Sequence, residues 1–182
     1  TRVVTIEQIF NEFSAGTNDV SAPRDFIKMM YELPGSTLKY VLLLGDGSFN
    51  NKELGDYELP TYQSVETLNT LETFVSDDFF AFLDDSEGDN IASSNNKLDV
   101  AIGRIPANNT RDANIAVEKI KRYYQEPAYG NWRNIGTYIA DDEDSNLHFS
   151  HAEENSNDFI VDVPTMNIEK IYLDAYRQVA GS

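Results

Sequence analysis

Acidic residues gather in two short stretches of the sequence, and both could bind a cation. The first lies between positions 77 and 89, with Lys97 the only nearby cation. Its carboxylates are Asp77, Asp78, Asp84, Asp85, Glu87 and Asp89. Calcium takes about six to eight oxygen ligands, so this stretch is a candidate calcium site. The alternative interpretation is a solvated acidic loop.

The first stretch does not fit an EF-hand. Asp85, Glu87 and Asp89 alternate along the chain as the oxygen ligands of a calcium loop do. However, Asn96 stands where an EF-hand has its last, bidentate carboxylate. Any calcium site here would therefore have its own geometry.

The second acidic stretch directly precedes two histidines. Asp141, Asp142, Glu143 and Asp144 are consecutive, and such a run needs a counter-ion or full solvation. The first three of these residues are the second candidate calcium site. His148 and His151 then fall three residues apart on an expected helix, which would bring them near one face. Two histidines alone are a weak transition-metal signal, so we interpret them rather as polar surface residues.

Nucleophilic catalysis finds no support within the chain. The sequence has no cysteine, which excludes a thiol nucleophile, disulfides and Cys-ligated metals among its 182 residues. No serine lies in a G-x-S-x-G context. Asp46 stands between Gly45 and Gly47, where it could bind a metal or could cap its own tight turn.

These residues follow elements that are typical of an α/β fold. Residues 40–44 and 97–105 are short apolar runs, which favour adjacent parallel strands that are buried on both faces. Apolar residues at helical spacing predict helices from Thr5, from an N-cap at Ser21 and from an N-cap at Thr110. Residues 76–83 predict a short helix, and residues 48–61 a long loop.

A second alternation of elements begins after residues 126–131, where Pro127 and Gly130 mark a boundary. A strand is expected at 135–140, a helix near 148–159 and a strand at 168–174. We therefore predict a first α/β subdomain over residues 1–130 and an incomplete second one over 131–182. Because the second is short and Thr1 is not an initiator methionine, we expect a fragment of a longer protein.

The net charge of the chain argues against two classes of partner, nucleic acids and anionic membranes. Thirty-one acidic against fourteen basic residues give a net charge of −17, which repels nucleic acid and anionic membranes. No apolar run is long enough to span a bilayer. We expect neither a nucleic-acid partner nor membrane insertion of this segment.

Five motifs, in order, resemble those of the gingipain-type cysteine peptidases. They lie at residues 39–49, 60–63, 76–80, 99–106 and 140–144, with the sequences KYVLLLGDGSF, PTYQ, SDDFF, DVAIGRIP and ADDED. The resemblance covers residues 35–176 and is greatest to the cell-surface sortases of the type IX secretion system in Bacteroidetes. It implies a caspase-like α/β fold, in which a parallel sheet is flanked by helices.

The resemblance also implies how function is divided. Family members carry their catalytic histidine, in a Gly-His-Gly context, and their catalytic cysteine beyond the equivalent of Asp174. We therefore expect no catalytic residue in this chain, and we expect the fragment to have no peptidase activity. Asp144, His148 and His151 lie in the region that corresponds to the specificity pocket, and calcium is an implied cofactor at the two acidic stretches.

The implied parent is a cell-surface cysteine peptidase or sortase. Its substrates would be proteins with C-terminal secretion signals, and its partners other components of the same secretion system. It would lie on the outer face of the outer membrane. The alternatives from other functional classes are a non-catalytic calcium-binding module of a surface protein and a small α/β binding domain.

Overall fold

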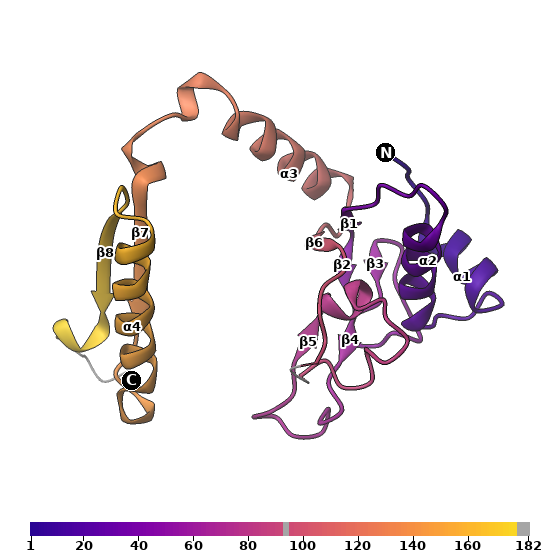
Figure 1. Cartoon of the computed structure of the whole chain (residues 1–182), viewed down its shortest axis with the longest axis horizontal. Helices are drawn as coiled ribbons and strands as arrows, with labels where there is room; N and C mark the ends of the chain where they lie inside the picture. The colour runs from indigo at the N-terminus through magenta and orange to yellow at the C-terminus, as the bar shows by residue number, and fades with distance from the viewer. Residues whose placement is uncertain (93–94, 178–182) are drawn as a thin grey trace. The chain divides into compact units, whose positions relative to one another are not determined.

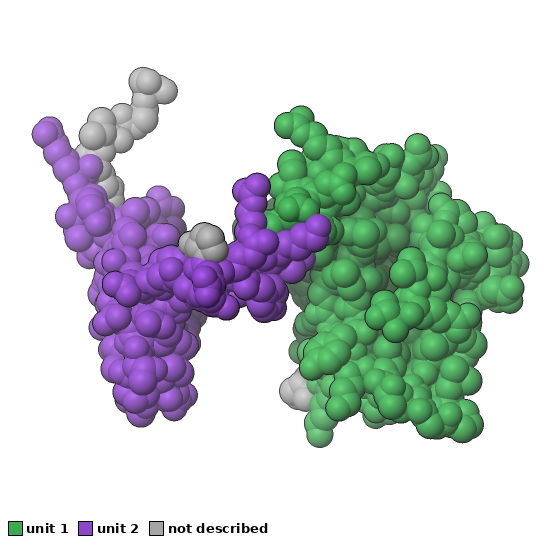
Figure 2. Space-filling model, turned by 90° about the horizontal axis from the view of Figure 1, so that it is seen from above, with its two compact units in different colours: residues 1–119 green, residues 120–182 purple. Residues whose placement is uncertain are grey.

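The computed structural model describes residues 1–92 and 95–177. Residues 93–94, which follow the first acidic stretch, and the last five residues of the expected second subdomain therefore lie outside the described residues. The chain divides into two compact units, residues 1–119 and residues 120–182 (Figure 2). The subdomain boundary between residues 130 and 131 stays a prediction.

The first unit is built around two parallel strands (Figure 1). Strand β1 (Tyr40–Leu44) pairs with β6 (Ala101–Ile105), and Tyr40 lies opposite Ala101. The predicted parallel neighbours are thus confirmed, although the second strand begins four residues later than the expected run. Helices α1 (Ile6–Phe13) and α2 (Ser21–Glu32) precede the strands and pack on one another.

Four very short strands follow β1, and one of them lies within the loop expected over residues 48–61. Strand β2 (Asp46–Gly47) pairs in parallel with β3 (Glu58–Leu59), and β4 (Tyr62–Gln63) pairs antiparallel with β5 (Val75–Ser76). The loop prediction for 48–61 is wrong at residues 58–59, because two-residue strands carry no readable alternation. The expected short helix is the 3-10 turn η1 (Asp78–Ala81).

The core of the first unit covers one face of its sheet only. Its buried residues are Ile27, Tyr62, Phe79, Phe80, Ala81, Leu83 and Val100. Val41 and Leu43 pack against this core, whereas Tyr40, Leu42 and Leu44 point the other way and are 79%, 61% and 54% exposed. Burial of this strand on both faces was a wrong prediction. A continuous apolar run fits that arrangement, but here the side chains alternate between a covered and an open face.

The second unit repeats the order strand, helix, strand, as expected. Strand β7 (Ile135–Ala140) pairs in parallel with β8 (Asn167–Tyr172), and α4 (Leu147–Asp162) connects them and packs on both. The remaining elements are 3-10 turns, namely η2 (Glu126–Ala128), η3 (Asn131–Asn134), η4 (Asp144–Asn146) and η5 (Leu173–Ala175). Helix α3 (Thr110–Tyr123) spans the division between the units, and its apolar stripe is largely exposed.

Both residues predicted as N-caps, Ser21 and Thr110, are instead the first residues of their helices. Ser21 is already helical, and its N–H and hydroxyl both donate to the Asp19 carboxylate, at 2.8 and 2.9 Å. Thr110 is likewise the first residue of α3, and the Asn109 side chain accepts the N–H of Asp112 at 2.9 Å. Asp and Asn compete with Ser and Thr for the cap, so neighbouring candidates cannot be ranked from sequence. Within the described residues, no helix combines the length and apolarity that crossing a membrane requires.

Candidate functional site

Hydrogen bonds from and to Asp46 fix the Gly45–Asp46–Gly47 turn at the carboxyl end of β1. The Asp46 carboxylate accepts the N–H of Gly47 at 2.9 Å, and the Asp46 N–H donates to the Tyr57 carbonyl at 2.9 Å. A Cβ atom on Gly45 would lie 2.9 Å from that carbonyl, and the φ of Gly45 is +153°. Of the two interpretations of Asp46, the turn-capping one is therefore confirmed.

Arg104 on β6 joins this turn to the first acidic stretch. Its Nε and Nη2 donate to the two Asp77 carboxylate oxygens, at 2.9 and 2.7 Å. Its Nη1 also donates to the carbonyls of Gly45 and Asp46, and its Nη2 to that of Pro60. We call this set the Arg104 hub. With 11% of the Arg104 side chain and 24% of the Asp77 side chain exposed, the hub is a largely desolvated, bidentate ion pair.

Most of the other acids in the first stretch have protein partners or face solvent. Asp85 lies 2.6 Å from Lys28 Nζ, and the hydrogen bond from this ammonium lowers the pKa of Asp85. The Glu87 carboxylate accepts the backbone N–H of Lys97 at 2.8 Å. The remaining members, Asp78, Asp84 and Asp89, are exposed. Arg104, Lys28 and backbone amides thus take much of the binding capacity that a cation would need.

Among the described residues, no three acidic or histidine side chains form a group that could hold a metal ion. The arrangement shown therefore does not itself present a calcium site, either at residues 77–89 or at 141–143. Calcium binding by these acids stays a prediction.

Millimolar calcium is expected to raise the melting midpoint of the chain if the predicted sites bind. The gain in unfolding free energy would be about 2.7 kcal/mol at a hundredfold excess over Kd, because only the folded chain would bind the ion. Melting curves with calcium, with chelator and with magnesium measure this. An unchanged midpoint in calcium, together with stabilisation by D85N/D89N, would contradict the prediction.

The second acidic stretch forms a turn of unusual backbone conformation between β7 and α4. Asp144, Ser145 and Asn146 have φ angles of 50°, 59° and 62°, so three consecutive non-glycine residues are left-handed. The turn places the Asp144 carboxylate 3.5 Å from His148 Nε2. Such backbone costs free energy and is often found where side chains must be presented in one orientation.

The structure brings together two of the three expected pocket residues. Asp144 and His148 form an exposed pair, with 72% and 54% of their side chains accessible. His151 is exposed one turn further along α4, and no contact joins it to Asp144 in the described chain. At the base of the turn, Asp141 Oδ1 is buried without a hydrogen-bond partner among the described residues.

A polar cluster that sequence analysis missed fixes α4 to β8. The Glu153 carboxylate lies 2.8 Å from Lys170 Nζ and accepts the Tyr172 hydroxyl at 2.8 Å. The hydrogen bonds from Lys170 and Tyr172 lower the pKa of Glu153, while burial first and then Glu153 raise the pKa of Tyr172. Beside it, Phe149 and Tyr172 meet edge to face with ring centroids 4.7 Å apart. The cluster orients the helix that carries His148.

The Glu153 cluster predicts loss of stability in acid. Since the pKa of Glu153 is lower in the folded chain, the cluster stabilises the fold fully above the ordinary value of 4.5. The contribution is lost as the pH falls through the lowered value, because the carboxylate is then protonated. In E153Q the unfolding free energy should no longer show this part of its pH dependence. Urea unfolding from about pH 3 to 6, the range of carboxylate titration, measures it. E154Q, at an exposed neighbour, is the matched control and should keep it.

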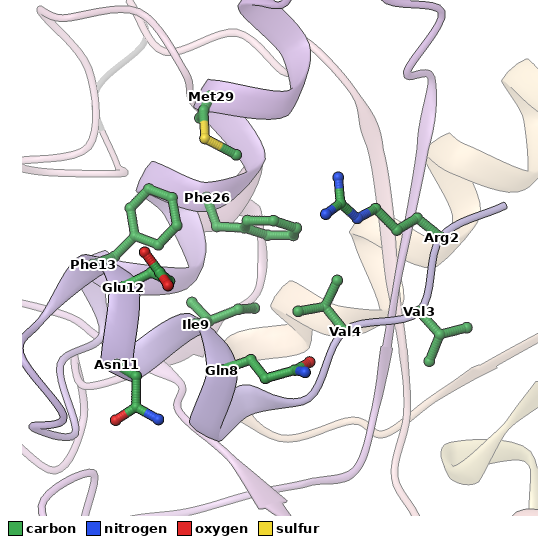
Figure 3. A pocket seen from close by; sticks show the side chains of 10 residues that line it. All are labelled: Arg2, Val3, Val4, Gln8, Ile9, Asn11, Glu12, Phe13, Phe26 and Met29. Atoms are coloured by element: carbon green, nitrogen blue, oxygen red, sulfur yellow. The ribbon is translucent and has the colours of Figure 1, made fainter.

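A cavity of about 540 Å³ lies between the N-terminal segment and helices α1 and α2 (Figure 3). Its lining residues are Arg2, Val3, Val4, Gln8, Ile9, Asn11, Glu12, Phe13, Phe26 and Met29. In Figure 3, Val4 and Ile9 point toward one another, whereas Val3 points away. The lining combines apolar groups with two amides, one arginine and one glutamate, and nothing in this set indicates catalysis.

Comparison with known proteins gives two positive findings. The sequence model of Peptidase family C25 matches residues 1–182. The structure is similar to the crystal structure of the Arg-specific cysteine proteinase gingipain R (RGPB), with a TM-score of 0.56 and 19% sequence identity. The match covers 89% of this chain and 33% of that one, so the chain spans about a third of its length. No curated protein matches the sequence. At this identity the structural likeness establishes the caspase-like α/β fold.

Proposed function

The chain belongs to peptidase family C25, and from this we propose that it is part of the catalytic region of a cell-surface cysteine peptidase of the sortase type. The observation that carries the proposal is the family match over all 182 residues. The likeness to gingipain R, a cysteine proteinase, supports it at the level of the fold.

The finer assignment is to PorU, the sortase of the type IX secretion system. It is supported by the five motifs quoted above and by their order along the chain. The substrates would then be secreted proteins with C-terminal signals. The enzyme would act at the cell surface together with other components of that secretion system.

In this proposal the nucleophile comes from outside these 182 residues, because the chain has no cysteine. A thiolate would attack the scissile carbonyl and expel the signal peptide as the leaving group. The resulting acyl enzyme would pass to water or to an amine. The part assigned to the chain is to supply the scaffold and one wall of the substrate site.

The wall that we assign to substrate is the turn between β7 and α4. Its pair of Asp144 and His148 is exposed, and its backbone is held in a costly conformation. A carboxylate beside Glu143 and Asp142 favours a cationic side chain of a peptide substrate. His151 lies on the same helix as His148. It would contact a part of the substrate that lies further from Asp144.

The purified chain is expected to hydrolyse no peptide and to ignore thiol-directed inhibitors. The longer natural protein is expected to contain a Gly-His-Gly segment and, after it, a cysteine whose replacement by alanine abolishes cleavage. Peptide hydrolysis by both forms, with and without inhibitor, measures this. A longer protein without that cysteine, or turnover by the chain alone, would overturn the proposal.

A further inference from the structure

The hairpin between β4 and β5 presents apolar side chains to solvent at its tip. Leu68 and Leu71 are 98% and 93% exposed, and Val65 on the same loop is 64% exposed. We call these three residues the leucine tip. Singly exposed apolar residues are common, but several on one short loop mark an interaction surface.

The tip is held in one conformation by Asn69, which lies between the two leucines. The Asn69 N–H donates to the Glu66 carbonyl at 2.9 Å, and the Asn69 side chain accepts the N–H of Leu71 at 3.1 Å. The Asn69 side-chain amide also donates to the Glu72 carboxylate at 2.9 Å, and the backbone carbonyl of Asn69 accepts the N–H of Thr73 at 2.8 Å. The leucines are therefore presented by an ordered loop, so little backbone entropy would be lost on binding.

The base of the hairpin anchors this loop to the core of the first unit. The N–H of Ser64 donates to the Phe74 carbonyl at 3.0 Å, and the Ser64 hydroxyl accepts the N–H of Phe74 at 3.2 Å. Ser64 is 4% exposed, and its neighbour Tyr62 stacks on Phe79 with ring centroids 5.0 Å apart. The tip thus projects from a rigid support.

Charge defines the chemistry of the partner. Glu66 and Glu72 flank the leucines, and no lysine or arginine occurs between Lys52 and Lys97. Anionic membranes and nucleic acids are repelled by such a surface. A complementary surface combines an apolar groove, which buries the leucines, with basic residues on its rim.

We propose that the leucine tip docks into an apolar groove of a protein partner, with lysine or arginine side chains at the rim of that groove opposite Glu66 and Glu72. The inference rests on exposure, loop order and charge at residues 64–74. It does not depend on the proposed peptidase function.

The test selects a random peptide library on phage against the full 182-residue chain. The comparison protein is the double variant L68S/L71S, which takes no part in the selection and should keep the melting midpoint because both side chains are already exposed. Enriched peptides are expected to combine apolar residues with lysine or arginine and to bind the double variant about tenfold more weakly or worse. V161S, at a 78% exposed valine on α4, is the matched control and should bind as the unchanged chain does.

Two further variants separate the parts of the proposal. E66Q/E72Q should weaken binding and reduce its salt dependence, because the rim charges would lose their partners. N69A should weaken binding while leaving both leucines in place, because the loop would then lose entropy on binding.

Other outcomes overturn the proposal. Equal binding of the enriched peptides to the unchanged chain and to L68S/L71S would do so. The proposal is also overturned if L68S/L71S abolishes self-association of the chain, measured by sedimentation, but leaves peptide binding unchanged. Loss of binding to phosphatidylcholine vesicles, again with unchanged peptide binding, overturns it too.

Discussion

Replacing Arg104 by methionine is expected to lower the unfolding free energy of the first unit by about 3 kcal/mol. The substitution leaves the Asp77 carboxylate without its bidentate partner. It also removes the donors to the carbonyls of Gly45, Asp46 and Pro60. Unpaired polar groups in a largely desolvated position cost more than the net value of the lost hydrogen bonds.

Urea unfolding followed by circular dichroism, with amide exchange of β1 and β6, measures the loss. R104K should recover only part of it, because an ammonium cannot reproduce the planar fork that joins the two Asp77 oxygens. R111M, on the exposed surface of α3, is the matched control and should change stability by less than about 0.5 kcal/mol. Equal effects of R104M and R111M would show that the Arg104 hub adds nothing to stability.

Replacing Phe80 by alanine is expected to lower the unfolding free energy of the first unit by about 4 kcal/mol. Phe80 is 1% exposed and meets Phe79 edge to face at 5.5 Å in the centre of the core. Removing the ring forfeits its burial and leaves a cavity that the packed neighbours fill only in part.

The same denaturant experiment measures this loss. F80L should cost less, since it leaves a smaller cavity. The matched control is F49A, because Phe49 is 92% exposed and its ring is not part of the core. A loss in F80A no larger than in F49A would be incompatible with the core described here.

Sequence patterns located the main helices and strands but did not show which of their faces are buried. The apolar run at Tyr40–Leu44 identified a parallel strand correctly. A short, continuously apolar run that ends at a glycine is typical of such a strand. The same run misled about Leu42, since apolar type alone does not reveal which face has a partner. Strands β2 to β5 have two residues each, too few for any periodicity to be seen.

Candidate site residues could be named from the sequence, but their contacts could not. Asp144 and His148 are four apart, but Asp144 precedes α4, and the left-handed turn is what brings its carboxylate to the imidazole. The pairing of Asp77 with Arg104 joins residues 27 positions apart, and that of Glu153 with Tyr172 joins residues 19 apart. No local pattern carries such partnerships, because they depend on how β6 and β8 lie beside other elements. The run of acids predicted a calcium site, which stays a prediction, and it did not reveal that Asp77 and Asp85 pair with Arg104 and Lys28.

The left-handed turn of Asp144, Ser145 and Asn146 also limits how this segment can evolve. Glycine, asparagine and aspartate adopt that backbone readily, whereas β-branched residues such as valine, isoleucine and threonine do not. A change to a β-branched residue at any of these three positions would thus add conformational cost. Drift at the turn is consequently confined to a few small or polar side chains, whereas His148 and its neighbours on α4 carry no such backbone restriction.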